Sequence, residues 1–171
     1  MPPGKAPRPR LFMDADVLFA GAASSNEHSA SLLILRLAEI TLIEAITSRQ
    51  VITEVERNLE NKLPAALPLF KLLVSRCLRV VKDPESEEIR QAQGRAQAKD
   101  LPILVAAREA GCRWLVTFNL KDFSPGFPEV VSLTPSAYIN AGANQRNLLG
   151  IQAVGDTLTI FANGHQIAQV V

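Results

Sequence analysis

The sequence predicts an α/β fold in which a mostly parallel sheet lies between two layers of helices, a three-layer α/β/α sandwich, followed by a small C-terminal β meander. Short apolar segments alternate along the chain with segments whose apolar residues recur at helical spacing. The connections between them are a few residues long, which favours parallel pairing through right-handed crossovers. The strand segments are continuous apolar runs, which is typical of strands covered on both faces.

Composition narrows the class of protein further. The 171 residues suit one ordinary domain, and the net charge of +1 gives no global field that would attract a nucleic acid. The uncharged run at residues 17–23 falls short of the roughly 20 residues that span a bilayer, so no membrane anchor is expected. Cys77 and Cys112 cannot form a disulfide framework, and no secretory signal pattern is present, which predicts a cytoplasmic protein.

The first half of the chain supplies the first two strands. Residues 1–10 contain four prolines and three basic residues, which predicts a basic, proline-rich arm. A short buried strand at residues 11–13 then leads into acidic residues. Ser29 caps a predicted helix that reaches residue 40, residues 41–45 form a second strand, and Ser48 opens a helix through residue 59.

The second half completes the domain, which we expect to cover residues 11–140. A helix at 67–76 precedes a strand at 78–81. Asp83 is the expected cap of the next helix, because Pro84 and several acidic residues follow it. Asp100 begins a helix that Gly111 ends, and residues 114–116 and 130–133 are the last two strands of the set.

The tail differs from the rest of the chain. Residues 148–171 alternate apolar and polar side chains around Gly155-Asp156 and Asn163-Gly164, and Asn-Gly is a strong hairpin signal. This pattern predicts a small β-hairpin or meander appendage. A sheet of two or three strands is marginal alone, so we expect it to dock on the domain or on a second subunit, and a homodimer is predicted.

Acidic side chains from four separate segments are predicted to meet at one edge of the sheet. The residues are Asp14 and Asp16 after the first strand, Glu54 on the helix opened by Ser48, Asp100, and Asp122. In open α/β sheets, ligands gather beyond the carboxyl ends of the strands. Two charges about 4 Å apart repel by roughly 4 kcal/mol at an effective dielectric constant of 20, so the cluster must bind a cation or hold protons. An all-oxygen set favours Mg²⁺ or Mn²⁺, which can promote phosphodiester hydrolysis.

Each of these side chains also has a structural explanation. Asp100 is a competent helix cap, Glu54 could belong to a solvated helix face, and Asp122 could be an ordinary loop charge. Thr117 could simply end its strand, although a hydroxyl beside a metal site can position a water molecule or a carboxylate.

Three motifs resemble those of the PIN domain over residues 11–138, namely LFMDADVLFAG, SRQVITEVERNL and KDLPILVAAREAGCRWLVTFNLKDF. The resemblance implies a metal-dependent ribonuclease with an α/β/α fold, a frequent homodimer, and in many members the toxin of a bacterial toxin–antitoxin pair. It also implies that Asp14, Glu54 and Asp100 are the first, second and third metal-binding acids. Asp16 stands where the family often has Asn and is assigned a supporting role.

The sequence departs from the family pattern at the fourth acidic position. The family commonly has Thr, any residue, then Asp, whereas Thr117 is followed two residues later by Asn119. An amide lacks the charge of a carboxylate, so a second metal ion is weakened unless Asp122 reaches the site. We therefore predict one tightly held ion, with Asp14, Asp100 and Asp122 as its ligands, Glu54 as a further catalytic acid, and Thr117 and Asn119 in support.

Two other functions remain open at this stage. FMDADVLF also resembles the Asp-x-Asp motif of haloacid-dehalogenase-type phosphotransferases, in which the first Asp is the nucleophile. A non-catalytic module that binds RNA or protein is the second alternative. Scattered basic residues near the acidic segments could contact RNA phosphates; these are Arg57, Lys62, Lys99, Arg108, Arg113 and Lys121.

Overall fold

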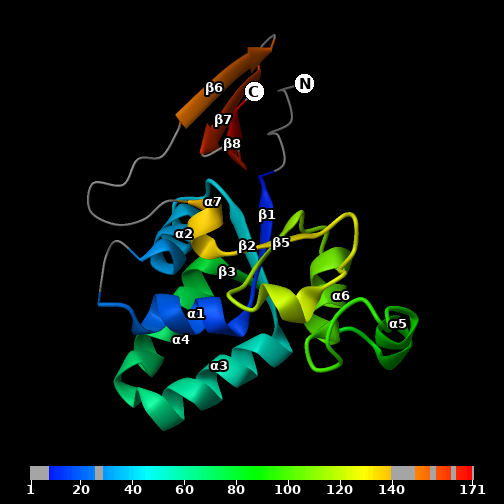
Figure 1. Cartoon of the computed structure of the whole chain (residues 1–171). Coiled ribbons are helices and arrows are strands. Elements are labelled where there is room, and N and C mark those ends of the chain that lie inside the picture. The colour runs from blue at the N-terminus through cyan, green and yellow to red at the C-terminus, as the bar shows by residue number, and fades with distance from the viewer. Residues whose placement is uncertain (1–7, 26–28, 140–148, 155–156, 163–164, 171) are drawn as a thin grey trace.

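The computed structural model describes residues 8–25, 29–139, 149–154, 157–162 and 165–170 (Figure 1). The strands are β1 (Arg10–Met13), β2 (Glu44–Ser48), β3 (Leu78–Val81), β4 (Trp114–Val116), β5 (Val131–Leu133), β6 (Leu149–Val154), β7 (Thr157–Ala162) and β8 (His165–Val170). The helices are α1 (Ala15–Ala23), α2 (Ala30–Glu39), α3 (Arg49–Lys62), α4 (Leu67–Cys77), α5 (Ser86–Gln91), α6 (Leu101–Glu109) and α7 (Pro135–Tyr138), with 3₁₀ turns η1 (Pro64–Ala66) and η2 (Leu120–Phe123).

The central sheet has five strands in the order β3-β2-β1-β4-β5, and every pairing in it is parallel. The chain first builds outward from β1 through β2 to β3, and then returns to the other side of β1 to add β4 and β5. The direction of the strand order therefore reverses between β1 and β4. In open α/β sheets this switch point is where the loops after adjacent strands diverge and a ligand crevice forms.

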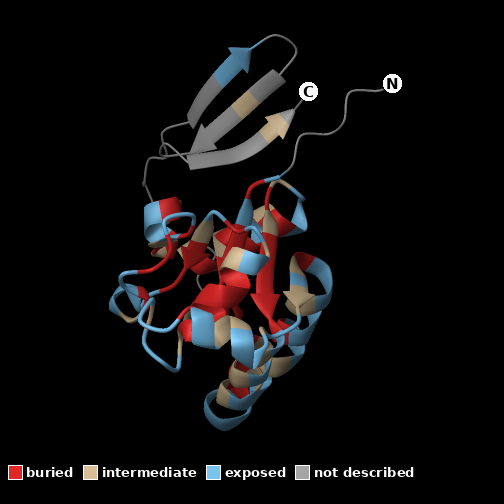
Figure 2. Cartoon of the chain, turned by 90° about the vertical axis from the view of Figure 1, so that its right-hand side faces the viewer, coloured by how far each residue is buried: buried red, intermediate tan, exposed pale blue. Residues whose placement is uncertain are grey.

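Helices cover both faces of this sheet, which confirms the predicted three-layer architecture. The helices α1, α2, α3 and α4 pack against one another on one side, whereas α6 contacts β2 and β4 from the other side and carries α5 (Figure 1). The buried residues concentrate in the sheet and in the helix faces turned toward it (Figure 2).

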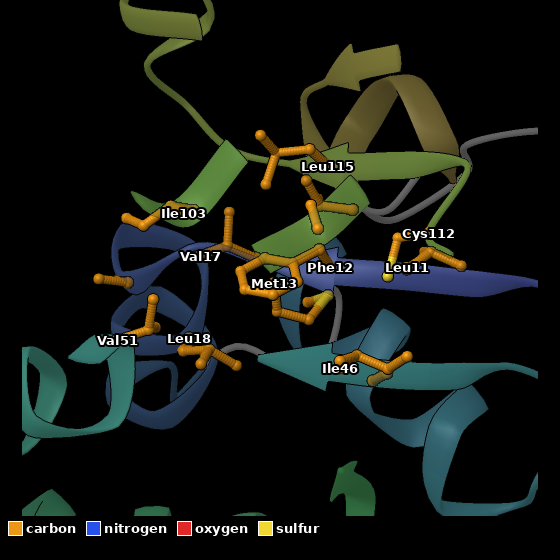
Figure 3. Packing of buried hydrophobic residues seen from close by; sticks show 14 of the residues in the cluster. Leu11, Phe12, Met13, Val17, Leu18, Ile46, Val51, Ile103, Cys112 and Leu115 are labelled. Carbon is orange, nitrogen blue, oxygen red and sulfur yellow. The ribbon is translucent and has the colours of Figure 1, made fainter. Parts of the chain in front are cut away.

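The first strand forms the centre of the core. Leu11, Phe12 and Met13 are fully buried, as the continuous apolar run predicts. Figure 3 shows their side chains among those of the neighbouring strands, including Ile46 of β2 and Leu115 of β4. This packing fixes the end of β1, and with it the position of Asp14.

Three strands and one helix cap differ from the sequence prediction. The first strand begins at Arg10 rather than at residue 11. The second strand is Glu44–Ser48 rather than 41–45, because Thr41 has a φ of 64° and belongs to the turn after α2. The last strand of the set begins at Val131 rather than at 130. The cap of α5 is Glu85 rather than Asp83, whose Oδ1 instead accepts a hydrogen bond from Gln50 N at 2.8 Å.

The sequence pattern did not predict the helix α1, which begins directly after Asp14. Its buried residues lie on more than one side because α2, α3 and α4 all contact it, so it lacks the polar face that reveals a helix. Asp14 is its N-cap, with Oδ1 accepting from Ala15 N. The short first strand and the first helix thus meet at this aspartate.

The tail forms a separate antiparallel sheet in the order β6-β7-β8, in agreement with the predicted meander. The two Gly-containing turns that the sequence places between its strands lie outside the described residues, as does most of the predicted N-terminal arm. Within the parts of the chain that the structure describes, no helix has the length and apolar character needed to cross a bilayer.

Candidate active site

Asp14 is held rigidly at the switch point between β1 and β4. Its side chain is 5% exposed. Its Oδ1 accepts a hydrogen bond from Ala15 N at 2.7 Å, and its Oδ2 accepts one from Thr117 Oγ1 at 2.8 Å. The backbone N–H of Asp14 donates to Val116 O at 3.0 Å, which ties it to the end of β4. The carboxylate orientation is therefore set by both adjacent strands.

The environment of Asp14 disfavours its charged form. Burial, reinforced by the negative charge of Asp16, raises the pKa of Asp14 from 3.8 to about 7, although the hydrogen bonds from Thr117 and Ala15 act in the opposite direction. The charged form of this carboxylate is destabilised by burial, and the residue lies at the edge of the sheet where ligands bind. Such a carboxylate is typical of a functional site that binds a cation.

Asp16 lies one residue into α1 and faces the loop after β4. Its Oδ2 accepts hydrogen bonds from Phe118 N at 3.0 Å and from Asn119 Nδ2 at 3.1 Å. Its Oδ1 is buried and has no hydrogen-bond partner. Burial raises the pKa of Asp16, and the charge of Glu54 adds to this rise. One oxygen of Asp16 is thus fixed by the protein and the other is left without a protein donor.

Asp100 occupies the N-cap position of α6, but its side chain makes no capping hydrogen bond. The structural explanation for this aspartate therefore does not account for its side chain. Its Oδ2 is buried without a hydrogen-bond partner and lies 3.6 Å from Lys99 Nζ. Burial raises the pKa of Asp100; the Lys99 ammonium lowers it, and the charges of Asp122 and Glu54 raise it.

A polar pocket of about 260 Å³ joins these side chains. It is lined by Asp14, Ala15, Asp16, Gln50, Glu54, Arg57, Lys99, Asp100, Ile103 and Asn119. The structure thus brings Asp14, Glu54 and Asp100 together from β1, α3 and α6, as the sequence analysis expects. Asp122 is not among the lining residues; its Oδ2 lies 3.4 Å from Lys99 Nζ, at the margin of the site.

Three polar lining residues had little or no support from the sequence. Gln50 was not predicted, although it lies one helical turn before Glu54 and therefore shares its face of α3. Arg57 and Lys99 were only two of several scattered basic residues. Of the others, Arg108 lies over the ring of Phe127 at 4.1 Å, and Arg113 donates to backbone carbonyls. Those two contacts are structural.

The donor chemistry of the pocket fits a hard divalent cation. The two unpartnered oxygens, Asp16 Oδ1 and Asp100 Oδ2, belong to acidic side chains that line the same pocket as Asp14. In the described part of the chain, no three acidic, His or Cys side chains stand ready to hold a metal ion together.

The fold and this pocket define a class: a three-layer α/β/α domain with acidic side chains gathered where the strand order reverses. The family model for the PIN domain matches residues 10–121, and the chain belongs to this family. No curated protein matches the chain by sequence.

Solved structures support the fold. One is a chain from VapBC2 of Rickettsia felis bound to a DNA fragment from their promoter, with 16% identity and a TM-score of 0.55 over 73% of this chain and 98% of that one. A chain of a toxin–antitoxin complex from Klebsiella pneumoniae is 20% identical, with a TM-score of 0.54 over 73% of this chain and 97% of that one. VapC20 of Mycobacterium tuberculosis, a sarcin–ricin loop cleaving toxin, is 19% identical, with a TM-score of 0.51 over 70% of this chain and 98% of that one.

Proposed function

We propose that this PIN domain protein is a divalent-metal-dependent endoribonuclease that acts as the toxin of a toxin–antitoxin pair. The observation that carries the proposal is the buried Asp14 at the switch point, in one pocket with Asp16, Glu54 and Asp100. Membership of the PIN family and the likeness in fold to toxin structures support the same activity.

Each group in the pocket has a role in this proposal. Asp14 and Asp100 would hold Mg²⁺ or Mn²⁺, with Asp122 as the further predicted ligand, and Thr117 keeps Asp14 oriented through its 2.8 Å hydrogen bond. A bound divalent cation would supply positive charge for the phosphodiester transition state and make water more acidic. In this proposal Glu54, which lines the same pocket, would take a proton from the attacking water.

The positive side chains of the pocket suit an RNA backbone. Arg57 and Lys99 line the same cavity as the acids, so they can contact the phosphates on either side of the bond that is cleaved. The described aromatic side chains do not form a stacking platform in the pocket, because none of them is among its lining residues. We therefore expect recognition through the backbone rather than through base stacking.

The phosphotransferase alternative makes a different prediction from the nuclease proposal. A phosphotransferase would accumulate a covalent phosphate on Asp14 when incubated with phosphate esters. A nuclease would not.

The direct test is digestion of RNA by the full chain. We expect single-stranded RNA labelled at its 5′ end to be cut internally in Mn²⁺ or Mg²⁺ and to remain intact in the presence of EDTA. Gel analysis of the fragments checks both outcomes. If the chain binds Mn²⁺ and RNA but leaves the RNA intact, the protein is a binding module instead of a nuclease.

A second pocket suits the proposed antitoxin. It lies between α1, α2 and α4, has a volume of about 360 Å³, and is lined by Gly21, Ser24, Ser25, Leu32, Arg36, Glu39, Leu69, Leu72, Leu73 and Arg76. Leu69 and Leu72 are 45% and 43% exposed, and two arginines and one glutamate flank the leucines. An apolar floor with a basic rim fits an amphipathic helix that carries acidic side chains.

The groove predicts a variant with separated functions. We expect Leu72→Asp to weaken binding of the protein encoded by the adjacent reading frame at least ~10-fold, because it places a charge on the apolar floor. RNA cleavage should be unchanged. Leu63→Asp is the matched control, since Leu63 is 38% exposed but does not line the groove. Equal binding by both variants, measured by calorimetry, would contradict this assignment.

A cytoplasmic location and a homodimer remain predictions from the sequence. Some support for the dimer comes from the tail, where β6 and β8 each pair only with β7 among the described strands. An unpaired strand edge is a ready site for pairing with a second copy.

A further inference from the structure

We infer that the site is built for one divalent cation and that the ammonium of Lys99 provides the second positive charge beside it. This inference rests on the proposed nuclease function. Lys99 Nζ lies 3.6 Å from Asp100 Oδ2 and 3.4 Å from Asp122 Oδ2, so it stands between two carboxylates that the sequence analysis assigned to metal binding.

The backbone holds Lys99 in this position. Gln97 N donates to Asp122 O at 2.7 Å, which joins the turn before α6 to η2. Leu101 N and Asp100 N both donate to Gln97 O at 2.9 Å, which closes that turn. These bonds keep the backbone of Lys99 close to Asp122, within reach of the lysine side chain.

The residue at the fourth acidic position, Asn119, also disfavours a second ion. Asn119 Nδ2 donates to Asp16 Oδ2 at 3.1 Å, so this amide acts through Asp16 and turns a donor, rather than a charged oxygen, toward it. Phe118 N donates to the same oxygen at 3.0 Å. Asn119 is thus a positioning residue that leaves only Asp16 Oδ1 for other contacts.

The charge balance follows from these contacts. Asp14, Asp16, Glu54 and Asp100 line the pocket, and a fifth acid, Asp122, stands beside it. An ammonium between Asp100 and Asp122 neutralises part of this charge and repels a second cation, so Asp122 pairs with Lys99 and the single ion is left to Asp14 and Asp100. The Lys99 side chain is also 74% exposed, so its charge is open to an RNA phosphate. Lysine suits this role because it is a compact point charge with three donors.

The test compares Lys99→Gln with Lys99→Arg, and uses Lys82→Gln as the control for loss of an exposed, ion-paired lysine. Lys82 Nζ lies 3.4 Å from Glu85 Oε1, and its side chain is 84% exposed. Calorimetry without RNA counts the Mn²⁺ ions bound. Single-turnover cleavage across a Mn²⁺ series gives the rate and its dependence on metal concentration.

We expect one Mn²⁺ in the wild type and two in Lys99→Gln, because the substitution removes the ammonium that keeps a second ion away from Asp122. Cleavage by Lys99→Gln should fall about 100-fold at low Mn²⁺, as for loss of one preorganised charge at a transition state. The cleavage rate of Lys99→Gln should then rise with the square of the Mn²⁺ concentration, whereas the rate of the wild type should rise in proportion to that concentration. Lys99→Arg and Lys82→Gln should retain one ion and a first-power dependence.

Failure of the inference can be distinguished from failure of the proposed function. A wild type that cleaves RNA with two bound ions overturns the inference and leaves the nuclease. So does a Lys99→Gln variant that binds one ion and cleaves at the wild-type rate. The wild type could also bind one Mn²⁺ and Lys99→Gln two, with no RNA cleavage by either. That result would overturn the proposed nuclease function and leave the inference about the number of bound ions standing. A wild type that binds no Mn²⁺ overturns both.

Discussion

Asp14→Asn should abolish RNA cleavage by the full chain, with the rate falling at least ~100- to 1000-fold, while the folded state becomes more stable at neutral pH. The loss of activity follows because an amide removes the negative charge that holds the cation in the pocket. The isosteric amide can still accept from Ala15 N, as Oδ1 of the aspartate does at 2.7 Å. Single-turnover cleavage in saturating Mn²⁺ measures the first effect.

The gain in stability follows from the raised pKa of Asp14. The rise from 3.8 to about 7 is caused mainly by burial, and it corresponds to roughly 4 kcal/mol of unfavourable free energy when the carboxylate is charged in the folded state. A buried amide bears part of the same cost, so we expect a net gain of roughly 1–3 kcal/mol. For a chain of this size that is roughly 2–4 °C in Tm for each kcal/mol.

The gain should depend on pH in a defined direction. Below about pH 4 the carboxyl is protonated in both states, and the wild type and Asp14→Asn should differ little. Between pH 4 and pH 7 the unfolded state ionises while the folded state keeps the proton, so the wild type loses stability as pH rises. Above pH 7 the difference becomes constant. Thermal unfolding in EDTA at pH 4, 6 and 8 measures it.

The control for this series is Glu60→Gln, which removes one exposed carboxylate from α3. It should leave both cleavage and Tm nearly unchanged, as for most surface substitutions. If Asp14→Asn unfolds instead of becoming more stable, Asp14 is a structural cap of α1 rather than a ligand. If it cleaves RNA at the wild-type rate, the proposed site is wrong.

The sequence predicted where the acids would meet because parallel topology determines it. Asp14 directly follows β1, Glu54 lies on the helix after β2, and Asp100 begins the helix that leads into β4, so each belongs to a segment that meets the carboxyl edge of the sheet. Asp14 and Asp100 could therefore be assigned to the same edge of the sheet although they are far apart in the sequence. The reversal of strand order between β1 and β4, which makes this edge a crevice, is visible only in the pairing.

What the sequence missed depended on tertiary contacts. The helix α1 has no polar face because three helices pack around it, so its apolar residues continued the pattern of the strand. The end of β2 was missed because Thr47 and Ser48 are polar. Both are buried, and the Thr47 hydroxyl donates to Met13 O at 2.9 Å. A polar residue satisfied by a neighbouring strand cannot be distinguished from a loop residue by sequence alone.

The same limit applies within the site. The sequence showed that Asn119 replaces an acid, but not that its amide donates to Asp16 at 3.1 Å. It placed Lys99 next to Asp100 in the chain, but the approach to Asp122 depends on how η2 folds against the turn before α6. The candidate acids could be identified from their positions along the chain, whereas the side chains that contact them are determined by the packing.

The affinity for Mn²⁺ should fall steeply as pH is lowered below 7. Asp14 has a pKa of about 7 in the folded state, so at lower pH a proton occupies the carboxylate that must bind the cation. Competition by one proton weakens apparent affinity about 10-fold for each pH unit. Calorimetry at pH 5.5, 6.5 and 7.5 measures this slope, and protons released on binding should approach one for each ion at pH 6.

Binding of the cation should also offset most of the effect of pH on stability. Without metal the wild type loses stability between pH 4 and 7, because the folded state holds the proton on Asp14. With Mn²⁺ in excess, a gain of about 2.7 kcal/mol at 100 times the Kd is available only where Asp14 is ionised, so the fall in Tm toward neutral pH should become much shallower. Asp14→Asn should show neither the fall in Tm nor its reduction by Mn²⁺. A Mn²⁺ affinity that is constant from pH 5.5 to 7.5 in the wild type would mean that Asp14 is not a ligand.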